Sequence, residues 1–173
     1  NFDHNLWRGA VEQGWTGVAV PPEADGLGLG QRGLGLLCEE LGRVTASLPL
    51  IANSLAVRAL LQADAQLHAA CIQALASGDG IACLAFAAPD DSGLGASASA
   101  RVQDGRLSGD KALAAFASIA ECALVQAVDE QGPGLYLVYL EQAGVKRHPV
   151  EGFDNARASA ALSFDEVPAI RLG

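Results

Sequence analysis

The strongest constraint on the fold is a change in hydrophobic periodicity at Gly80. Before it, apolar residues recur at the three- and four-residue spacing of amphipathic helices, and after it short apolar segments are separated by turn residues. Helices and strands segregated in this way exclude the alternating order of a doubly wound sheet. The pattern predicts an α+β fold, with an N-terminal α-helical domain over residues 1–78 and a small antiparallel β-barrel or sandwich domain over 79–173.

Four helices are expected in the first part. Asp3 is a suitable N-cap for a helix within residues 1–13, and Gly14 suits its left-handed end. Residues 17–33 are rich in Gly and contain Pro21-Pro22, which is typical of an ordered connector. The other helices are expected over residues 31–45, 47–63 (apolar nearly all round, and therefore buried) and 64–76, the last capped by Asp64 and stopped by Gly78.

Seven short strands are expected in the second part. They are separated by the turn sequences Asp104-Gly105, Ser108-Gly109, Gly132-Pro133-Gly134 and Glu151-Gly152. Regular spacing of this kind is typical of an antiparallel sandwich or barrel. The strands are expected over residues 81–88, 97–103, 107–111, 121–128, 135–141, 145–149 and 158–165.

Charge and hydropathy exclude two classes of partner. The chain carries 11 Lys and Arg against 20 Asp and Glu, a net charge of −9, and its basic residues are scattered. Nucleic-acid binding depends on clustered cations, so no nucleic-acid partner is expected. Apolar runs such as 81–88 are far shorter than the roughly 20 residues of a membrane span, and no signal-peptide pattern opens the chain. The sequence therefore predicts a cytoplasmic protein with no membrane span.

The sequence predicts neither a metal site nor a disulfide framework. His4, His68 and His148 lie far apart and have no carboxylate at ligand spacing. The cysteines never approach CxxC spacing and lie among apolar neighbours, which predicts reduced thiols in the core. They are Cys38, Cys71, Cys83 and Cys122.

One glycine motif invites a dinucleotide-binding interpretation. Gly28, Gly30 and Gly33 match GxGxxG at the start of a predicted helix. A true fingerprint follows a buried strand, whereas Pro21-Pro22 precedes this one, so the interpretation is rejected. The paired carboxylates fall on helix surfaces or near turns and are interpreted as solvated. No G-x-S-x-G elbow of a serine hydrolase is present.

The composition also bears on completeness. The chain contains no methionine and opens within a helical pattern. We therefore expect a piece of a longer chain, or a chain from which modified methionines were dropped.

Several stretches, taken in order, resemble the acyl-CoA dehydrogenase family. Residues 7–30, WRGAVEQGWTGVAVPPEADGLGLG, resemble its helical-domain signature, and the EELGR within 38–43 matches a family motif. LAFAAP at 84–89 stands where the family has Y-x-x-T-E-P. LSGDK at 107–111 corresponds to L-x-G-x-K, and residues 153–168, ending in FDEVP, resemble its F-D-E-V-x-V-P strand. The succession covers essentially the whole chain.

The resemblance implies an oxidoreductase that uses FAD to remove hydrogens from the α and β carbons of an acyl-CoA thioester. Family members bind FAD between the β domain and a C-terminal helical domain, and they pass electrons to an electron-transferring flavoprotein. A homo- or hetero-oligomer, dimer or tetramer, is implied as well. The catalytic glutamate belongs to the C-terminal domain, so no catalytic residue is expected on this chain.

The resemblance also assigns cofactor- and substrate-binding residues. Ser92 is assigned a hydroxyl near the thioester. The residues expected to contact the flavin, chiefly through backbone groups, are Phe86, Ala87, Ala88, Leu113, Ala114 and Ala115.

The flavin-facing side chains depart from the family pattern. Ala87 replaces a threonine that bonds the flavin, Ala88 replaces an acid, and 113–115 replaces a W-I-T stretch. Each lost hydrogen bond costs about 0.5 to 1.5 kcal/mol, and the lost indole about 1 to 3 kcal/mol. A second hypothesis is therefore a non-catalytic subunit that pairs with an active homologue and binds flavin weakly or not at all. A third, supported only by composition, is a carrier or assembly module unrelated to flavin.

Overall fold

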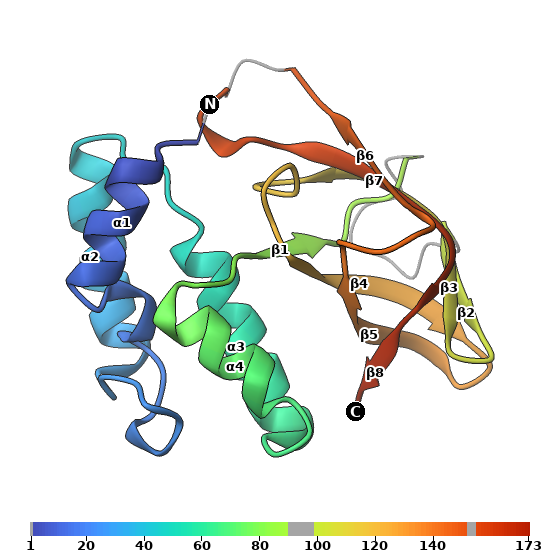
Figure 1. Ribbon diagram of the computed structural model, residues 1–173, viewed down its shortest axis with the longest axis horizontal. Helices are drawn as coiled ribbons and strands as arrows, with labels where there is room; N and C mark the ends of the chain where they lie inside the picture. Colours follow the sequence, from blue (N-terminus) through green and yellow to red (C-terminus); the bar gives the residue numbers. More distant parts are fainter. Residues whose placement is uncertain (1, 90–98, 152–154) are drawn as a thin grey trace. The chain divides into compact units, whose positions relative to one another are not determined.

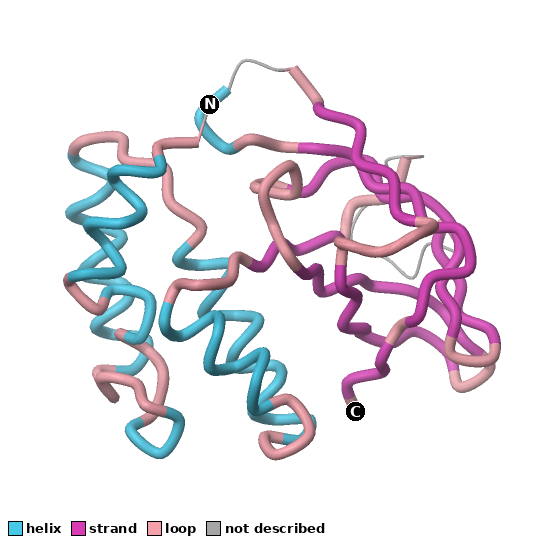
Figure 2. The backbone as a smooth tube through the Cα atoms, in the orientation of Figure 1, coloured by secondary structure: helices cyan, strands magenta, loops and turns pink. Residues whose placement is uncertain are grey.

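The computed structural model describes residues 2–89, 99–151 and 155–173 (Figure 1). The chain divides into two compact units, Asn1–Ile81 and Ala82–Gly173. Within the described residues, all α-helices belong to the first unit and all strands to the second (Figure 2). The α+β fold predicted from the periodicity is confirmed.

Helix α1, His4–Glu12, begins and ends where the sequence predicts. The Asp3 carboxylate accepts hydrogen bonds from the amides of Asn5 (3.0 Å) and Leu6 (2.9 Å), and Gly14 is left-handed with φ of 71°. Trp7 is buried, and its indole N–H donates to the carbonyl of Gly78 at 3.1 Å. This bond ties the first helix to the end of the helical unit.

The connector between α1 and α2 is ordered by its own backbone. It contains two short 3₁₀ segments, η1 (Trp15–Gly17) and η2 (Pro22–Ala24). The amides of Leu27 and Leu29 donate to the carbonyls of Gly17 and Val18, at 2.9 and 3.0 Å. Helix α2, Gly30–Arg43, follows this connector rather than a strand. The GxGxxG match therefore lacks the strand that a dinucleotide fingerprint requires.

Helices α3 (Leu50–Asp64) and α4 (Ala69–Ser77) pack against each other. The buried side-chain amide of Asn53 donates to the carbonyls of Leu75 (3.2 Å) and Gly80 (3.0 Å). Because the amide satisfies two carbonyls at the end of α4, it fixes where the helical unit stops.

Two details of α3 and α4 differ from expectation. Asp64 does cap a turn, accepting from the amides of Gln66 and Leu67, but α4 itself starts only at Ala69. Helix α3 is not buried all round, because Ile51 and Leu55 are 54% and 42% exposed. An apolar helix sequence predicts that most of the helix is buried. It does not show which faces of the helix are packed against the rest of the helical unit.

The second unit is an eight-stranded, mostly antiparallel sheet that does not close into a barrel. Its strand order is β6-β7-β3-β2-β4-β5-β8, with β1 also paired to β4. The β1–β4 and β2–β4 pairs are parallel, which the sequence pattern did not predict. The strands are β1 (Ala82–Ala85), β2 (Ala100–Gln103), β3 (Arg106–Ala114), β4 (Cys122–Asp129), β5 (Gly132–Tyr139), β6 (Val145–Pro149), β7 (Ala160–Pro168) and β8 (Ile170–Leu172).

One predicted turn is confirmed and two are wrong. Asp104 and Gly105 both have positive φ and join β2 to β3. Ser108-Gly109 instead lies inside β3, where a Cβ on Gly109 would meet the carbonyl oxygen of Ser99 at 2.1 Å. Residues 132–134 lie in β5 and pair with β4. On the other side of β5, β8 pairs only with Leu135–Leu137. Pro133 therefore lies at an open edge of the sheet, where its missing N–H costs no hydrogen bond.

Strand β8, missed at the sequence level, is held by a cluster of polar side chains. Arg171 of β8 forms a salt bridge with Asp129 at the end of β4. The buried Tyr136 hydroxyl donates to the same carboxylate at 2.6 Å and accepts from Arg171 at 3.1 Å. These bonds lower the pKa of Asp129 to about 2, below its ordinary value of 3.8. The hydrogen bond from Arg171 makes the largest contribution, and the one from Tyr136 comes next.

The remaining sequence expectations concern cysteines, metals and membranes. None of the four cysteines forms a disulfide, and three are buried as predicted, whereas Cys38 on α2 is only half-buried. The described residues contain no cluster of His, Cys, Asp or Glu able to hold a metal ion. None of the helices described is long and apolar enough to cross a membrane.

We expect Gly78→Ala to destabilise the helical unit. Gly78 has φ of 81°, and an added Cβ would lie 2.3 Å from Val11 Cγ2. The left-handed conformation alone costs an alanine about 1–2 kcal/mol. Urea unfolding followed by circular dichroism measures the loss. The matched control is Gly35→Ala in α2, where nothing lies within 4 Å of the added Cβ and a gain of about 0.5–1 kcal/mol is expected. Equal midpoints for the two variants would contradict this account.

We expect Asp129→Asn to lower the urea midpoint at pH 5 and to lose that effect in acid. The folded pKa of Asp129 is depressed to about 2, so its stabilisation is complete above 3.8 and disappears as the pH falls through 2. Urea titrations of both proteins between pH 5 and pH 2 measure this convergence. Asp110→Asn, an exposed position with no salt bridge in the described chain, is the control. A constant difference between variant and wild type at every pH would refute the assignment.

Candidate functional site

The structure brings together the two segments that the resemblance assigns to the flavin. Strand β1 ends at Ala85, and residues 86–88 continue past the C-terminal part of β3. The amide of Ala112 donates to the carbonyl of Ala87 at 3.0 Å. Segments 86–88 and 113–115 are therefore neighbours, although more than twenty residues separate them along the chain.

A bulge in β3 shapes the second segment. Lys111 pairs with Leu162 and Ala114 with Ala160, so β3 uses one more residue than β7 over this stretch. A bulge of this kind interrupts the ladder and redirects a side chain. Leu113 is accordingly 48% exposed, while the Ala112 amide is directed to the segment after β1.

The six predicted flavin-contact residues differ in exposure. Ala88 and Ala114 are buried, so their side chains belong to the core and only their backbone is available to a ligand. The other four, Phe86, Ala87, Leu113 and Ala115, are half-buried or exposed. The predicted substrate contact, Ser92, lies outside the described residues.

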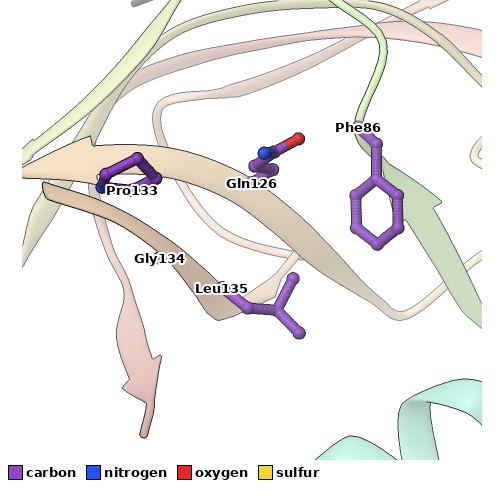
Figure 3. Close-up of a pocket in the computed structure, with 5 residues that line it drawn as sticks. All are labelled: Phe86, Gln126, Pro133, Gly134 and Leu135. Atoms are coloured by element: carbon purple, nitrogen blue, oxygen red, sulfur yellow. The ribbon is translucent and has the colours of Figure 1, made fainter. Parts of the chain in front are cut away.

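A cavity of about 390 Å³ adjoins the first segment (Figure 3). Of the predicted site residues that the structure describes, Phe86 lines it, together with Pro133, Gly134 and Leu135 of β5 and Gln126 of β4. The Gln126 side chain extends toward Phe86, and its amide has no hydrogen-bond partner in the described part of the chain. The cavity therefore combines apolar walls with one available amide.

The sequence reasoning did not single out Gln126. The signal was present, because Gln126 is a lone polar residue within the apolar run CALVQAV at 122–128. In a strand whose neighbours are buried, a lone amide points either to a satisfied core group or to a ligand site. Only the pairing of Gln126 with Leu135 shows that it faces a cavity.

Lys111, the last residue of the LSGDK motif, is buried next to these segments. It is 2% exposed, and its ammonium lies 3.4 Å from the Ser99 hydroxyl, with no carboxylate partner in the described residues. Burial lowers its pKa from the ordinary value.

The arrangement suits binding rather than acid–base chemistry. None of the described residues that line the cavity is titratable, and the side chains of 86–88 and 113–115 are all apolar. What this region offers a ligand is backbone groups, apolar side chains and the Gln126 amide.

Comparison with known proteins agrees with this architecture. The family model described as "Acyl-CoA dehydrogenase, N-terminal domain" matches residues 1–79. A variant of the Tcur3481-Tcur3483 steroid ACAD is 32% identical, with a TM-score of 0.86 over 99% of this chain and 48% of that one. The chain belongs to the acyl-CoA dehydrogenase family.

Two other family structures match nearly the whole chain. The ChsE4-ChsE5 complex from Mycobacterium tuberculosis is 23% identical, with a TM-score of 0.85, and covers 99% of this chain and 48% of that one. A glutaryl-CoA dehydrogenase from Mycobacterium smegmatis, in complex with FADH2, is 19% identical, with a TM-score of 0.85 and coverages of 99% and 46%. The chain thus spans about half the length of these structures. No curated protein matches the sequence.

Proposed function

We propose that this chain supplies the helical and β portions of an FAD-dependent acyl-CoA dehydrogenase-like oxidoreductase. The observation that carries the proposal is the Ala112–Ala87 hydrogen bond, since it holds the first segment that the family resemblance assigns to the flavin against the residue immediately before the second. The 32% identity to a steroid ACAD supports it further. The substrate class is an acyl-CoA thioester, and the acceptor of electrons is an electron-transferring flavoprotein.

The residues present fit a flavin ring, which has broad apolar faces and a polar edge. Half-buried Ala87 and Ala115 present small side chains, so the backbone around them stays within reach of a planar ligand. Phe86 and the exposed Leu113 supply apolar surface, and Gln126 supplies an amide beside Phe86. When bound, FAD would supply a two-electron acceptor. The described residues would hold it through backbone groups and apolar contacts, which would orient it and exclude water from its faces.

A specific observation favours a second candidate, a non-catalytic subunit of a two-component assembly. Ala87, Ala88 and Ala115 offer no side-chain hydrogen bond to a flavin. Two of the matching structures carry two-component names, Tcur3481-Tcur3483 and the ChsE4-ChsE5 complex. In this alternative, an active homologue in the same hetero-oligomer holds the functional flavin.

Exposed apolar side chains favour assembly under either proposal. The largest on the helical unit include Leu36 and Val44, at 67% and 71% exposure. Exposed apolar surface that no partner covers promotes association, so we propose a homo- or hetero-oligomer, dimer or tetramer. A cytoplasmic location is proposed from the sequence composition alone.

The visible absorbance of the longest product of this gene, purified with excess FAD and then desalted, tests the proposal. A retained flavin spectrum that acyl-CoA bleaches is the expected result. A colourless protein would overturn the enzyme proposal. A colourless protein that also gains flavin only when co-purified with a homologous subunit would establish the alternative.

We expect Ala87→Thr to strengthen flavin binding. A single restored hydrogen bond contributes about 0.5–1.5 kcal/mol, so FAD affinity should rise roughly two- to tenfold. Ala87→Val is the matched control, since valine has the shape of threonine without its hydroxyl. Fluorescence titration of FAD against the three proteins measures the change. If the valine variant gains as much affinity as the threonine variant, the effect comes from shape and the flavin contact is wrongly assigned.

A further inference from the structure

The helical unit contains a second cavity, of about 210 Å³, that shares no residue with the proposed flavin site. It lies between the connector, the start of α2 and one face of α3, the helices labelled in Figure 1. Its walls are mainly apolar and include Val20, Val57 and Leu61. Its polar side chains are Gln31, Ser54 and Arg58, and none of the described residues that line it is acidic.

The start of α2 leaves unsatisfied donors on residues that line this cavity. The helix has 14 residues, and its N-cap, Leu29, makes no side-chain capping bond. The first backbone bond within the helix runs from the Gly33 amide to the Leu29 carbonyl, which leaves the amides of Gly30 and Gln31 without an acceptor in the described chain. Such donors and the helix dipole favour an anion.

An independent observation comes from Ser54 on α3. The residue is only 5% exposed, and its hydroxyl has no hydrogen-bond partner among the described residues. No side-chain polar atom that is fully enclosed in the described structure lacks a partner. The Ser54 hydroxyl is therefore open to the cavity that Ser54 lines, as an unused donor.

Arg58 completes the set one turn further along α3. Its side chain is exposed, lines the same cavity and forms no salt bridge in the described part of the chain. A guanidinium beside a hydroxyl and two helix-terminal amides matches a carboxylate, which accepts several hydrogen bonds at once. One cation against apolar walls suits a singly charged group with a short aliphatic body better than a phosphate dianion.

We propose that this cavity binds a small aliphatic carboxylate. The carboxylate accepts from the amides of Gly30 and Gln31, the Ser54 hydroxyl and the Arg58 guanidinium, and its hydrocarbon part contacts Val57 and Leu61.

Titration of the full chain with sodium butyrate, followed by amide chemical shifts in NMR, tests this site. Sodium chloride at equal ionic strength is the reference, and inorganic phosphate is the second probe. We expect saturable shifts at Gly30, Gln31 and Ser54 with butyrate. Non-saturating shifts, or none at 50 mM butyrate, would overturn the site, and tighter binding of phosphate would overturn the ligand class.

Variants separate the site from general charge effects. Arg58→Gln should weaken butyrate binding about tenfold, and Ser54→Ala about threefold, since each removes one donor. Arg32→Gln is the matched control, because it removes the same charge from the first turn of α2 at a residue that does not line the cavity. Equal weakening by the two arginine variants would overturn the proposal. Circular dichroism melting confirms that each variant is folded.

Discussion

Strand β4 is the element on which the β unit depends. Strands β1 and β2 pair with it in parallel, and β5 pairs along its whole length in antiparallel fashion. The register of these pairs places Leu124 beside Leu84, and Gln126 beside Leu135. Because β1 is held at this register, residues 86–88 leave the sheet next to the β3 bulge, where the Ala87 carbonyl meets the Ala112 amide. The candidate site is thus a consequence of strand pairing.

The sequence predicted what local chemistry decides. Asp3 and Gly14 delimit α1 because a cap and a left-handed glycine act within a few residues, and Asp104-Gly105 forms its turn for the same reason. It failed where a distant partner decides. Gly109 looked like a turn residue, but it is required inside β3 because Ser99 approaches its backbone too closely for a Cβ. Strand β8 has only three residues and depends on Arg171 reaching Asp129.

The candidate site divides in the same way. Motif order proposed segments 86–88 and 113–115 as flavin contacts, because the family resemblance is carried by local sequence. Their contact, and the bulge that exposes Leu113, depends on the β3–β7 register, which no single segment encodes. Gln126 was missed because a lone polar residue in an apolar strand has two meanings, and the position of Phe86 and Leu135 around it decides between them.

In the proposed flavin site, the alanines would change how a flavin is held without removing the means to hold it. A threonine hydroxyl adds a hydrogen bond at one edge of the ring, whereas backbone groups and apolar contact remain when that hydroxyl is absent. Contacts of the second kind are less directional, so they tolerate a shifted or tilted ring. Under this proposal, alanine at positions 87 and 115 would weaken control over the orientation and electronics of the flavin more than it would weaken flavin binding itself. Catalysis depends on the orientation of the flavin relative to the substrate. A subunit that binds its cofactor without fixing that orientation would need a partner subunit to carry out the reaction.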